Sequence, residues 1–244
     1  MNPTVIDFHS HVLPKMDDGS RSPEMSLQML HQMYATGTDL VVATPHYYGN
    51  REDVASFLQR RAHTYEVLSE AIDEQVPRVI LGAEVAFYSG LLSDDYSSLC
   101  TEGTNTLLLE MPHTSWTHYE LNVISELCLN RDIQVVLAHW ERYAPYQENN
   151  MILSQIQELP VSIQINAGSL LPLRTRKKWL DLFSAGKAHL IGSDCHDPKR
   201  RAPNLDKART MIRKKLGIEV LNRIDLLGAE LAGISERNPE HKSV

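Results

Sequence analysis

Short, nearly continuous apolar runs recur along the chain, and most of them end in a charged or imidazole side chain. Runs of this kind are typical of strands that are buried on both faces of a parallel sheet. They cover residues 5–9, 40–44, 79–84, 107–110, 135–139, 161–166 and 190–194. The pattern therefore predicts seven parallel strands.

Stretches with helical periodicity separate most of these runs. They predict helices over residues 23–35, 54–72, 119–129, 151–159, 176–185 and 205–216. The first helix is expected to begin with Ser22 as its N-cap and Pro23 at its first helical position. Residues 87–104 show no convincing period. Seven strands that alternate with helices predict an α/β protein with a parallel barrel.

The composition fits one globular domain. The chain has 244 residues, of which 42% are hydrophobic and 23% are charged, and this balance argues against disorder. We expect residues 1–234 to form a single domain and the polar segment 235–244 to be a frayed tail. The sequence has no apolar run of membrane-spanning length, no secretory signal and only three cysteines, so we expect a cytoplasmic protein without membrane insertion.

The net charge of −7 hides an asymmetry along the chain. Residues 174–215 hold thirteen Lys and Arg against four Asp and Glu, whereas the rest holds eleven against twenty-seven. This basic segment is either a face that meets an anionic partner or a set of solvated helix faces. The acidic total argues against general nucleic-acid binding, which needs many cations that face phosphates.

Candidate chemistry lies where the predicted strands end. The residues at or just after these ends are His9, His11, His46, Glu84, Glu110, His139, Asp194 and His196. In a β/α barrel these positions meet at the C-terminal rim, where active sites lie. Imidazoles and carboxylates gathered at one rim are costly unless cations bind there, so the pattern predicts a metal site.

The ligand types narrow the metal and the reaction. Histidine mixed with Asp and Glu suits Mn²⁺, Fe or Zn²⁺, and the lack of cysteine ligation argues against a structural zinc site. The candidate ligands are too many for one ion, so we expect a cluster of two or three metals. Such a cluster favours hydrolysis of a phosphate ester.

The order of these residues resembles the polymerase and histidinol phosphatase (PHP) superfamily. More closely, the chain resembles the metal-dependent protein-tyrosine phosphatases of bacterial capsule and exopolysaccharide synthesis. The matching phrases are Asp7-Phe8-His9-Ser10-His11, Asp17-Asp18-Gly19, Ala43-Thr44-Pro45-His46, Gly82-Ala83-Glu84, Leu137-Ala138-His139 and Gly192-Ser193-Asp194-x-His196. They extend over most of the chain, from residue 7 to about residue 201.

The resemblance implies a distorted (β/α)₇ barrel with three divalent metals, most simply Mn²⁺. One metal would be held by His9, His11, Glu110 and Asp194, with Glu110 bridging to a second site that Glu84 and His139 complete. A third site would comprise Asp18, His46 and His196. Asp18 lies at the position that the family uses, and the adjacent Asp17 is the less favoured ligand.

The resemblance also assigns Arg142 and Arg201 to the phosphoryl group of the substrate. A guanidinium matches two phosphoryl oxygens and supplies fixed positive charge, although sequence alone does not choose between Arg200 and Arg201. Trp140 replaces the proline that the family usually has after the histidine, and we expect it to alter the loop or a substrate wall.

Cys195 and Arg201 satisfy Cys-x₅-Arg, the signature of thiol-based tyrosine phosphatases. That chemistry needs a loop of backbone amides around the phosphate. The intervening residues include Pro198 and no glycine, which disfavours such a loop. For the general acid, His113, His118 and Asp197 are candidates, each with a structural role as the alternative.

Together with the metal site that the residues predict, the resemblance implies a metal-dependent protein-tyrosine phosphatase in which a hydroxide that bridges metals attacks phosphorus. The expected substrate is the phosphotyrosine tail of a bacterial tyrosine kinase. A small-molecule phosphomonoesterase of the histidinol-phosphatase type is one alternative. A non-catalytic, metal-binding partner of a polysaccharide assembly complex is the other.

Overall fold

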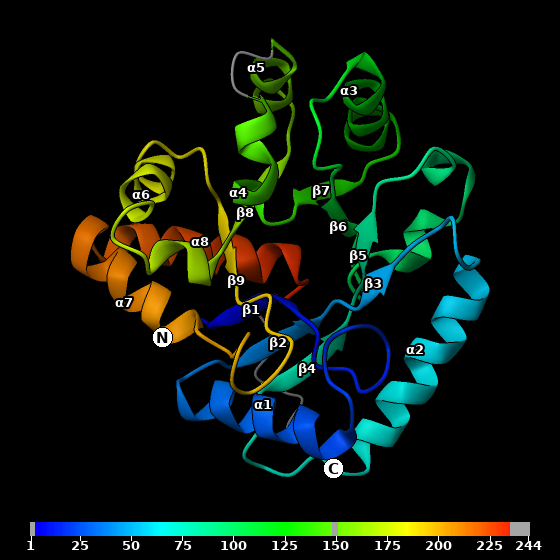
Figure 1. Cartoon of the computed structure of the whole chain (residues 1–244), viewed down its shortest axis with the longest axis vertical. Coiled ribbons are helices and arrows are strands. Elements are labelled where there is room, and N and C mark those ends of the chain that lie inside the picture. Colours follow the sequence, from blue (N-terminus) through cyan, green and yellow to red (C-terminus); the bar gives the residue numbers. More distant parts are fainter. Residues whose placement is uncertain (1–2, 148–150, 235–244) are drawn as a thin grey trace.

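The structure, a computed structural model, describes residues 3–147 and 151–234 (Figure 1). The expected tail at 235–244 lies outside the described residues. Within this part of the chain, strands and helices alternate, and every strand pairing is parallel. The result is an α/β fold with a curled parallel sheet, as the apolar runs predict.

Each of the seven apolar runs contains a strand, and two of the strands are interrupted. The strands are β1 (Ile6–Ser10), β2 (Leu40–Ala43), β3 (His46–Tyr47), β4 (Arg78–Leu81), β5 (Glu84–Ala86), β6 (Thr106–Glu110), β7 (Gln134–Leu137), β8 (Ser162–Asn166) and β9 (Leu190–Gly192). Thr44 and Pro45 separate β2 from β3, because proline has no N–H to donate to the ladder. Gly82 and Ala83 separate β4 from β5.

The interruptions divide the sheet into two connected parts. The strand order is β1-β2-β4 in one part and β3-β5-β6-β7-β8-β9 in the other. A parallel bridge between Ser10 and Cys195 joins the end of β1 to the segment after β9. In the second part, His46 pairs with Glu84 and Ala86 pairs with Glu110, so polar residues from three strands line up near the same sheet edge.

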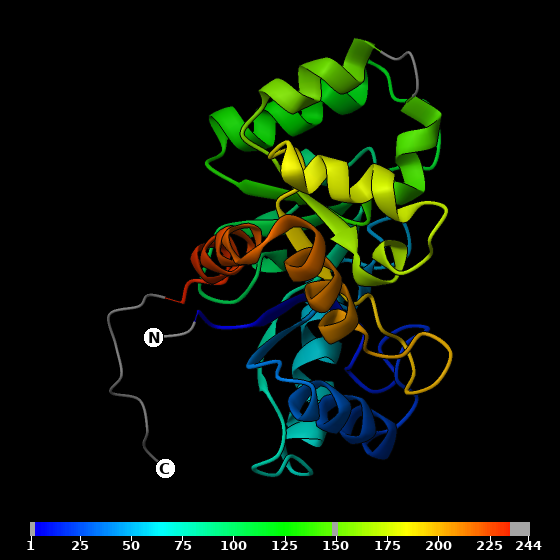
Figure 2. The same cartoon turned by 90° about the vertical axis from the view of Figure 1, so that its left-hand side faces the viewer.

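Helices cover the outside of the curled sheet. They are α1 (Pro23–Ala35), α2 (Val54–Ser69), α3 (His118–Ser125), α4 (Trp140–Tyr143), α5 (Met151–Glu158), α6 (Arg176–Ser184), α7 (Leu205–Leu216) and α8 (Ile218–Leu231). Helices α1 and α2 lie at one end of the molecule and α3 and α5 at the other (Figures 1 and 2). None of the helices in the described residues is long and apolar enough to cross a bilayer.

The helix predictions hold with small differences. The Ser22 side chain caps α1 by accepting the Met25 N–H. Residues 87–104, which have no period, form two short 3₁₀ turns, Leu91–Ser93 and Tyr96–Leu99. Helix α8 is absent from the sequence prediction; it starts directly after Gly217, whose φ of 93° ends α7.

Two apolar clusters hold the sheet. The larger one lies between the strands and the surrounding helices. The smaller one gathers side chains from the inner face of six strands with the end of α8, namely Ile6, Phe8, Leu40, Val42, Ile80, Leu108, Val136, Leu190 and Leu231. Because the next residues along several of these strands are polar, this cluster forms an apolar floor beneath the strand ends.

Candidate metal centre

The nine side chains expected as metal ligands come together in one chain of contacts. His9, His46, Glu84 and Glu110 lie within strands, whereas His11, His139, Asp194 and His196 follow strand ends and Asp18 lies in the loop before α1. Loops 11–22 and 193–204 run side by side at this edge in both views (Figures 1 and 2). The candidate metal centre thus lies where these two loops leave the C-terminal ends of β1 and β9.

Glu84 occupies the middle of the cluster and is fully buried. Its Oε2 atom lies 3.2 Å from Nε2 of both His9 and His11 and 2.9 Å from Nδ1 of His46. Its Oε1 atom lies 2.6 Å from Nε2 of His139. One carboxylate therefore faces four imidazoles, each with a ring nitrogen directed toward it.

Two further groups flank this centre. On one side, Glu110 lies 3.4 Å from His139, and His113 completes a set that could hold an ion. On the other side, the Asp18 carboxylate lies 3.3 Å from His196 and 3.6 Å from His46. The groups share His139 and His46 with the central cluster, so ions bound in them would be neighbours.

The grouping differs in one respect from the one that the family resemblance implies. Glu84, and not Glu110, contacts His9 and His11. The register explains this, because Glu84 pairs with Leu108 and therefore Glu110 lies two residues further along its strand. A step of two residues is about 6.6 Å. His113 is expected from the sequence as an acid and not as a ligand, whereas in the structure its ring nitrogen faces the same space as Glu110 and His139.

Asp194 connects the imidazoles to the two expected arginines. Its Oδ1 atom lies 3.7 Å from Nε2 of His9 and 3.4 Å from Nε2 of His11. Its Oδ2 atom accepts from Arg142, from Arg201 at 2.9 Å and from the Asn166 amide at 2.7 Å. One oxygen thus faces the cluster and the other faces the guanidinium groups.

The backbone is specialised at two of these positions. His139 has a φ of 29° and Asp194 a φ of 52°, values in the left-handed region that non-glycine residues rarely adopt. Each residue lies just after a strand, where this turn redirects the side chain. Such conformations persist only where the surrounding structure supports them, and they concentrate at functional sites.

Polar partners orient the imidazoles from behind. Asp17 Oδ2 lies 2.7 Å from Nδ1 of His11, and Gln164 Oε1 lies 3.2 Å from Nδ1 of His9. A hydrogen bond at one ring nitrogen fixes the tautomer and presents the other nitrogen to an ion. Asp17 therefore orients a candidate ligand. This agrees with the expectation that Asp18, and not Asp17, is the metal ligand.

Burial and opposing charges shift the ionisation of the cluster. Burial raises the pKa of Glu84, but the charge on His9 and hydrogen bonds from the histidines hold it well below its ordinary value. Burial lowers the pKa of both His139 and His196 to about 4, so these rings are neutral at pH 7. For His9 and His11 burial acts in the same direction, but the neighbouring carboxylates outweigh it and raise the pKa of both rings. The cluster thus combines ionised carboxylates with imidazoles, and cations that bind there would displace the protons of His9 and His11.

The donor set fits divalent cations. Several buried atoms that face the cluster lie close to one another but form no hydrogen bond of good geometry among the described residues, namely Glu84 Oε2, Asp194 Oδ1, His46 Nδ1 and His196 Nε2. Buried polar atoms are rarely left without partners, because each one costs about 1–3 kcal/mol. Mixed nitrogen and oxygen donors that converge in this way satisfy the coordination preference of Mn²⁺, Fe or Zn²⁺.

Comparison with known proteins identifies the family of this chain. The family model for capsular polysaccharide synthesis proteins, CpsB/CapC, matches residues 5–230. The chain belongs to the CpsB/CapC family. This confirms the resemblance to the capsule-synthesis branch on which the sequence prediction rests.

Named relatives of this CpsB/CapC chain are tyrosine phosphatases. The tyrosine-protein phosphatase YwqE of Bacillus subtilis is 29% identical over 223 residues, which cover 88% of this chain and 87% of YwqE. The tyrosine-protein phosphatase CpsB of Streptococcus pneumoniae is 27% identical over 230 residues, which cover 87% of this chain and 91% of that protein.

Solved structures support the fold of the CpsB/CapC chain. A structure from the study of YwqE and CpsB, described as metal-dependent tyrosine phosphatases, superposes with a TM-score of 0.82 at 24% identity and covers 95% of both chains. Dihydropyrimidinase from Brevibacillus agri superposes more loosely, with a TM-score of 0.59 at 12% identity over 96% of this chain and 71% of the other.

Cys195 is fully buried in this CpsB/CapC chain, and its backbone bridges Ser10. Burial raises the pKa of its thiol well above the ordinary value, so the thiolate form that attacks phosphorus is disfavoured. The Cys-x₅-Arg spacing is therefore coincidental. Cys195 is a buried packing residue, whereas Arg201 contacts Asp194 at the cluster.

Trp140 is also buried and lines no part of the cluster. Its ring packs 5.8 Å from that of Trp116 and 5.5 Å from that of Tyr143, centroid to centroid. Trp140 therefore belongs to an aromatic packing cluster with Trp116 and Tyr143.

The three candidates for the general acid differ in their positions relative to the cluster. The Asp197 carboxylate accepts the backbone N–H groups of Lys199, Arg200 and Arg201, which is a structural role. His118 starts helix α3 and is exposed. Of the three candidates, His113 is the one beside the cluster, with its ring 6.3 Å from that of His139.

Proposed function

We propose that this chain is a metal-dependent phosphatase that hydrolyses phosphotyrosine on proteins. The observation that carries the proposal is the arrangement at Asp194, whose two oxygens face imidazoles on one side and Arg142 and Arg201 on the other. Cations and guanidinium groups at one point suit a dianionic phosphoryl group. The names of YwqE and CpsB support the choice of phosphotyrosine.

We assign the metals to the nine side chains that converge. The assigned ligands are His9, His11, Asp18, His46, Glu84, Glu110, His139, Asp194 and His196. Three divalent ions are proposed, with Mn²⁺ first and Fe or Zn²⁺ as alternatives, because the donors form overlapping groups of nitrogen and oxygen atoms. Bound there, such ions would activate water and neutralise phosphoryl oxygens.

Arg142 and Arg201 are proposed to hold the phosphoryl group. Both line a hollow of 340 Å³ together with Asp194 and Asn166. Each guanidinium has five N–H donors, so each retains donors after its contact with Asp194. The contacts of Arg201 with Asp194 and Asp18 support its choice over Arg200, which lines the same hollow.

The leaving group of phosphotyrosine lessens the need for a proton donor. A phenol has a pKa of about 10, far below that of an alkyl alcohol, so its anion departs more readily. His113 is exposed beside the cluster and is the proposed donor if one is used.

The proposal also includes the barrel type, the domain bounds, the protein substrate and the cellular location. We assign the fold as a distorted (β/α)₇ barrel with the active site at the C-terminal rim, and residues 1–234 as one domain. The substrate would be the tail of a bacterial tyrosine kinase in capsule synthesis, met in the cytoplasm. Membership of the capsular polysaccharide synthesis family supports this setting.

The test measures hydrolysis before and after chelation. Purified protein is expected to hydrolyse a phosphotyrosine peptide, to lose activity when its metals are removed, and to regain it with Mn²⁺. Metal content is measured in parallel. Faster turnover of histidinol phosphate than of the peptide would favour a small-molecule phosphatase. Absence of all hydrolysis by the Mn²⁺-loaded protein would favour a non-catalytic partner and contradict the proposal.

A further inference from the structure

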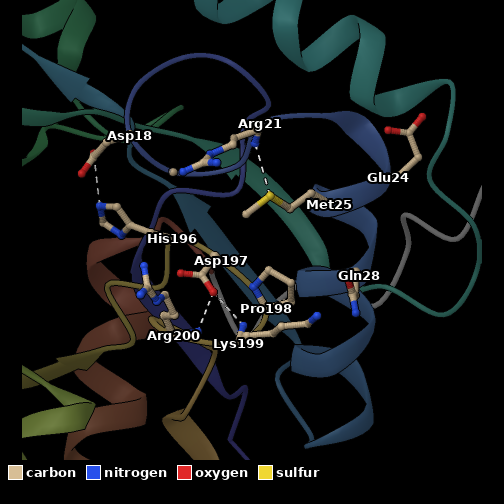
Figure 3. Close-up of a pocket in the computed structure, with 11 residues that line it drawn as sticks. Asp18, Arg21, Glu24, Met25, Gln28, His196, Asp197, Pro198, Lys199 and Arg200 are labelled. Atoms are coloured by element: carbon tan, nitrogen blue, oxygen red, sulfur yellow. Dashed lines mark hydrogen bonds and ion pairs between the residues drawn. The ribbon is translucent and has the colours of Figure 1, made fainter.

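A hollow of 530 Å³ opens beside the metal centre and runs along helix α1 (Figure 3). We call it the α1 hollow and define it by Asp18, Arg21, Gln28, His196, Lys199 and Arg200, all of which line it. In Figure 3, Asp18 and His196 lie at one end and Gln28 lies at the other. The α1 hollow therefore leads directly away from two proposed metal ligands.

The α1 hollow carries three unpaired cations. Arg21, Lys199 and Arg200 are exposed, and none of them forms an ion pair with any residue that the structure describes. By contrast, other basic side chains nearby are engaged: Arg201 pairs with Asp194, and Arg60 pairs with Glu52. Free cations at the mouth of an active site attract anionic groups on a substrate.

Three carboxylates line the same hollow, namely Asp18, Glu24 and Asp197. Asp197 is committed to three backbone N–H groups of its own loop. Asp18 faces His196, His46 and Arg201. Glu24 remains, and it lies at the start of α1 with its side chain exposed. Hydrogen bonds to neutral N–H groups leave the charge of Asp197 in place, and that charge also acts on Arg200. The three carboxylates therefore equal the three cations in number, and a metal ion bound at Asp18 would leave the hollow with an excess of positive charge.

The loop that carries two of these cations is held in place. Gln32 of α1 donates its Nε2 N–H to the Pro198 carbonyl at 3.3 Å, and the His196 N–H donates to the Arg201 carbonyl at 2.9 Å. Together with the hydrogen bonds of Asp197, these contacts fix the positions from which Lys199 and Arg200 extend. A site formed in advance loses less conformational entropy on binding.

The shape suits an extended chain better than a small molecule. A neighbouring hollow shares Glu24 and Gln28 with the first and continues along α1 to Ala35. Met25 and Pro198 add apolar surface to the α1 hollow. We propose that the α1 hollow binds the polypeptide that flanks the phosphotyrosine, and that Arg21, Lys199 and Arg200 select acidic side chains in it. This inference rests on the proposed phosphotyrosine activity.

The test compares three substrates. One is para-nitrophenyl phosphate, which has no peptide. The other two are phosphotyrosine peptides of equal length, one with Asp and Glu flanking the phosphotyrosine and one with Asn and Gln in their place. The Mn²⁺-loaded enzyme is expected to prefer the acidic peptide through a lower KM, and the preference should shrink at high salt.

The variant Arg21→Ala/Lys199→Ala removes two cations of the α1 hollow that contact no proposed metal ligand. We expect kcat/KM for the acidic peptide to fall about 3-fold for each cation lost, roughly 10-fold in all, through KM. Turnover of the neutral peptide and of para-nitrophenyl phosphate should not change. The matched control is Lys177→Ala/Lys214→Ala, which removes the same charge from exposed positions outside the hollow.

Several results would overturn the inference. The first is that Arg21→Ala/Lys199→Ala lowers kcat/KM equally for the acidic and the neutral peptide. The second is that the control variant lowers kcat/KM for the acidic peptide by the same factor. The third is that Arg21→Ala/Lys199→Ala leaves kcat/KM for the acidic peptide unchanged. The control also decides whether the basic segment 174–215 acts as a whole or through this hollow alone. Binding of the two peptides, each with a non-hydrolysable phosphotyrosine analogue, is measured by fluorescence anisotropy. This measurement tests the α1 hollow even if the protein hydrolyses no phosphotyrosine, a result that would contradict the proposed function alone.

Discussion

Arg142 and Arg201 contact the same atom, Oδ2 of Asp194, although they come from helix α4 and from the loop after β9. Like charges this close are tolerated because one buried carboxylate lies between them. Burial raises the pKa of Asp194, but His9, His11 and Arg142 hold it below its ordinary value, so the carboxylate stays ionised. The pair thus offers fixed positive charge beside the proposed metals.

Loss of either arginine is therefore expected to affect every phosphate ester. We predict that Arg142→Ala and Arg201→Ala each lower kcat/KM by about 10²-fold, because each removes donors for charge that develops in the transition state. Steady-state kinetics on para-nitrophenyl phosphate and on a phosphotyrosine peptide measure this. Arg200→Ala is the matched control and should leave para-nitrophenyl phosphate unaffected. Unchanged kinetics in both variants would remove the arginines from the phosphoryl site.

His9 tests the metal assignment. His9→Ala deletes one of the three imidazoles that face Glu84 Oε2, and we expect at least about 10²-fold lower activity together with lower metal content. Metal analysis and phosphatase assays are run on the same preparation. His31→Ala is the control, since His31 is partly exposed and pairs with Asp73 away from the cluster. Full metal content with normal turnover in His9→Ala would contradict the assignment.

The strand-end histidines and carboxylates could be predicted because parallel strands deliver their ends to one edge, whatever the details of packing. Their grouping could not. Whether Glu84 or Glu110 meets His9 depends on strand register, which brings Glu84 level with Leu108, and on the break at Pro45 that carries His46 beside Glu84. Register is a tertiary property, and the spacing of residues along the chain does not contain it.

Helix α8 shows a signal that the sequence does contain. Val220, Leu221, Ile224, Gly228 and Leu231 are buried along one face at helical spacing. Because α8 follows α7 after Gly217 alone, the expected alternation with a strand hides it. The α1 hollow, in contrast, depends on loops 11–22 and 193–204 lying side by side, which spacing cannot reveal.

Asp17 is expected to act through His11. Asp17→Asn weakens the bond to His11 Nδ1 and, because the same carboxylate accepts the N–H groups of His46 and Gly19, loosens the loop before α1. We predict roughly 10-fold to 100-fold weaker metal binding, the range for such outer partners. Titration of the metal-free protein with Mn²⁺ measures it. The same change at Asp73, outside the cluster, serves as the control, and equal affinities in the two variants would refute the role.

Two glycines give a matched test of packing behind the centre. A Cβ at Gly192 would lie 2.5 Å from the Cβ of His9, whereas one at Gly228 in α8 would meet nothing closer than 3.7 Å. Gly192→Ala is expected to lower the free energy of unfolding by about 1–3 kcal/mol and to displace His9. Gly228→Ala should instead raise it by about 0.5–1 kcal/mol, because alanine favours a helix. Denaturant unfolding measures both variants. An unchanged free energy of unfolding in Gly192→Ala would contradict the prediction, because it would mean that β9 can move away from His9 at no cost.

The last prediction decides between two kinds of phosphatase chemistry. A thiol-based enzyme requires Cys195 as a thiolate facing the phosphate, whereas here the thiol is fully buried with its pKa raised well above the ordinary value by that burial. Its neighbours Asp194 and His196 face the cluster instead. Cys195→Ala is therefore expected to retain most of the activity, and any loss should follow reduced stability from the missing sulfur, of about 1 kcal/mol. Kinetics are compared with denaturant unfolding and metal content on the same sample. Complete loss of turnover in a folded, metal-loaded Cys195→Ala protein, or a phosphocysteine trapped on the unaltered enzyme, would overturn the metal-dependent mechanism, because neither follows from a thiol that packs behind the strands.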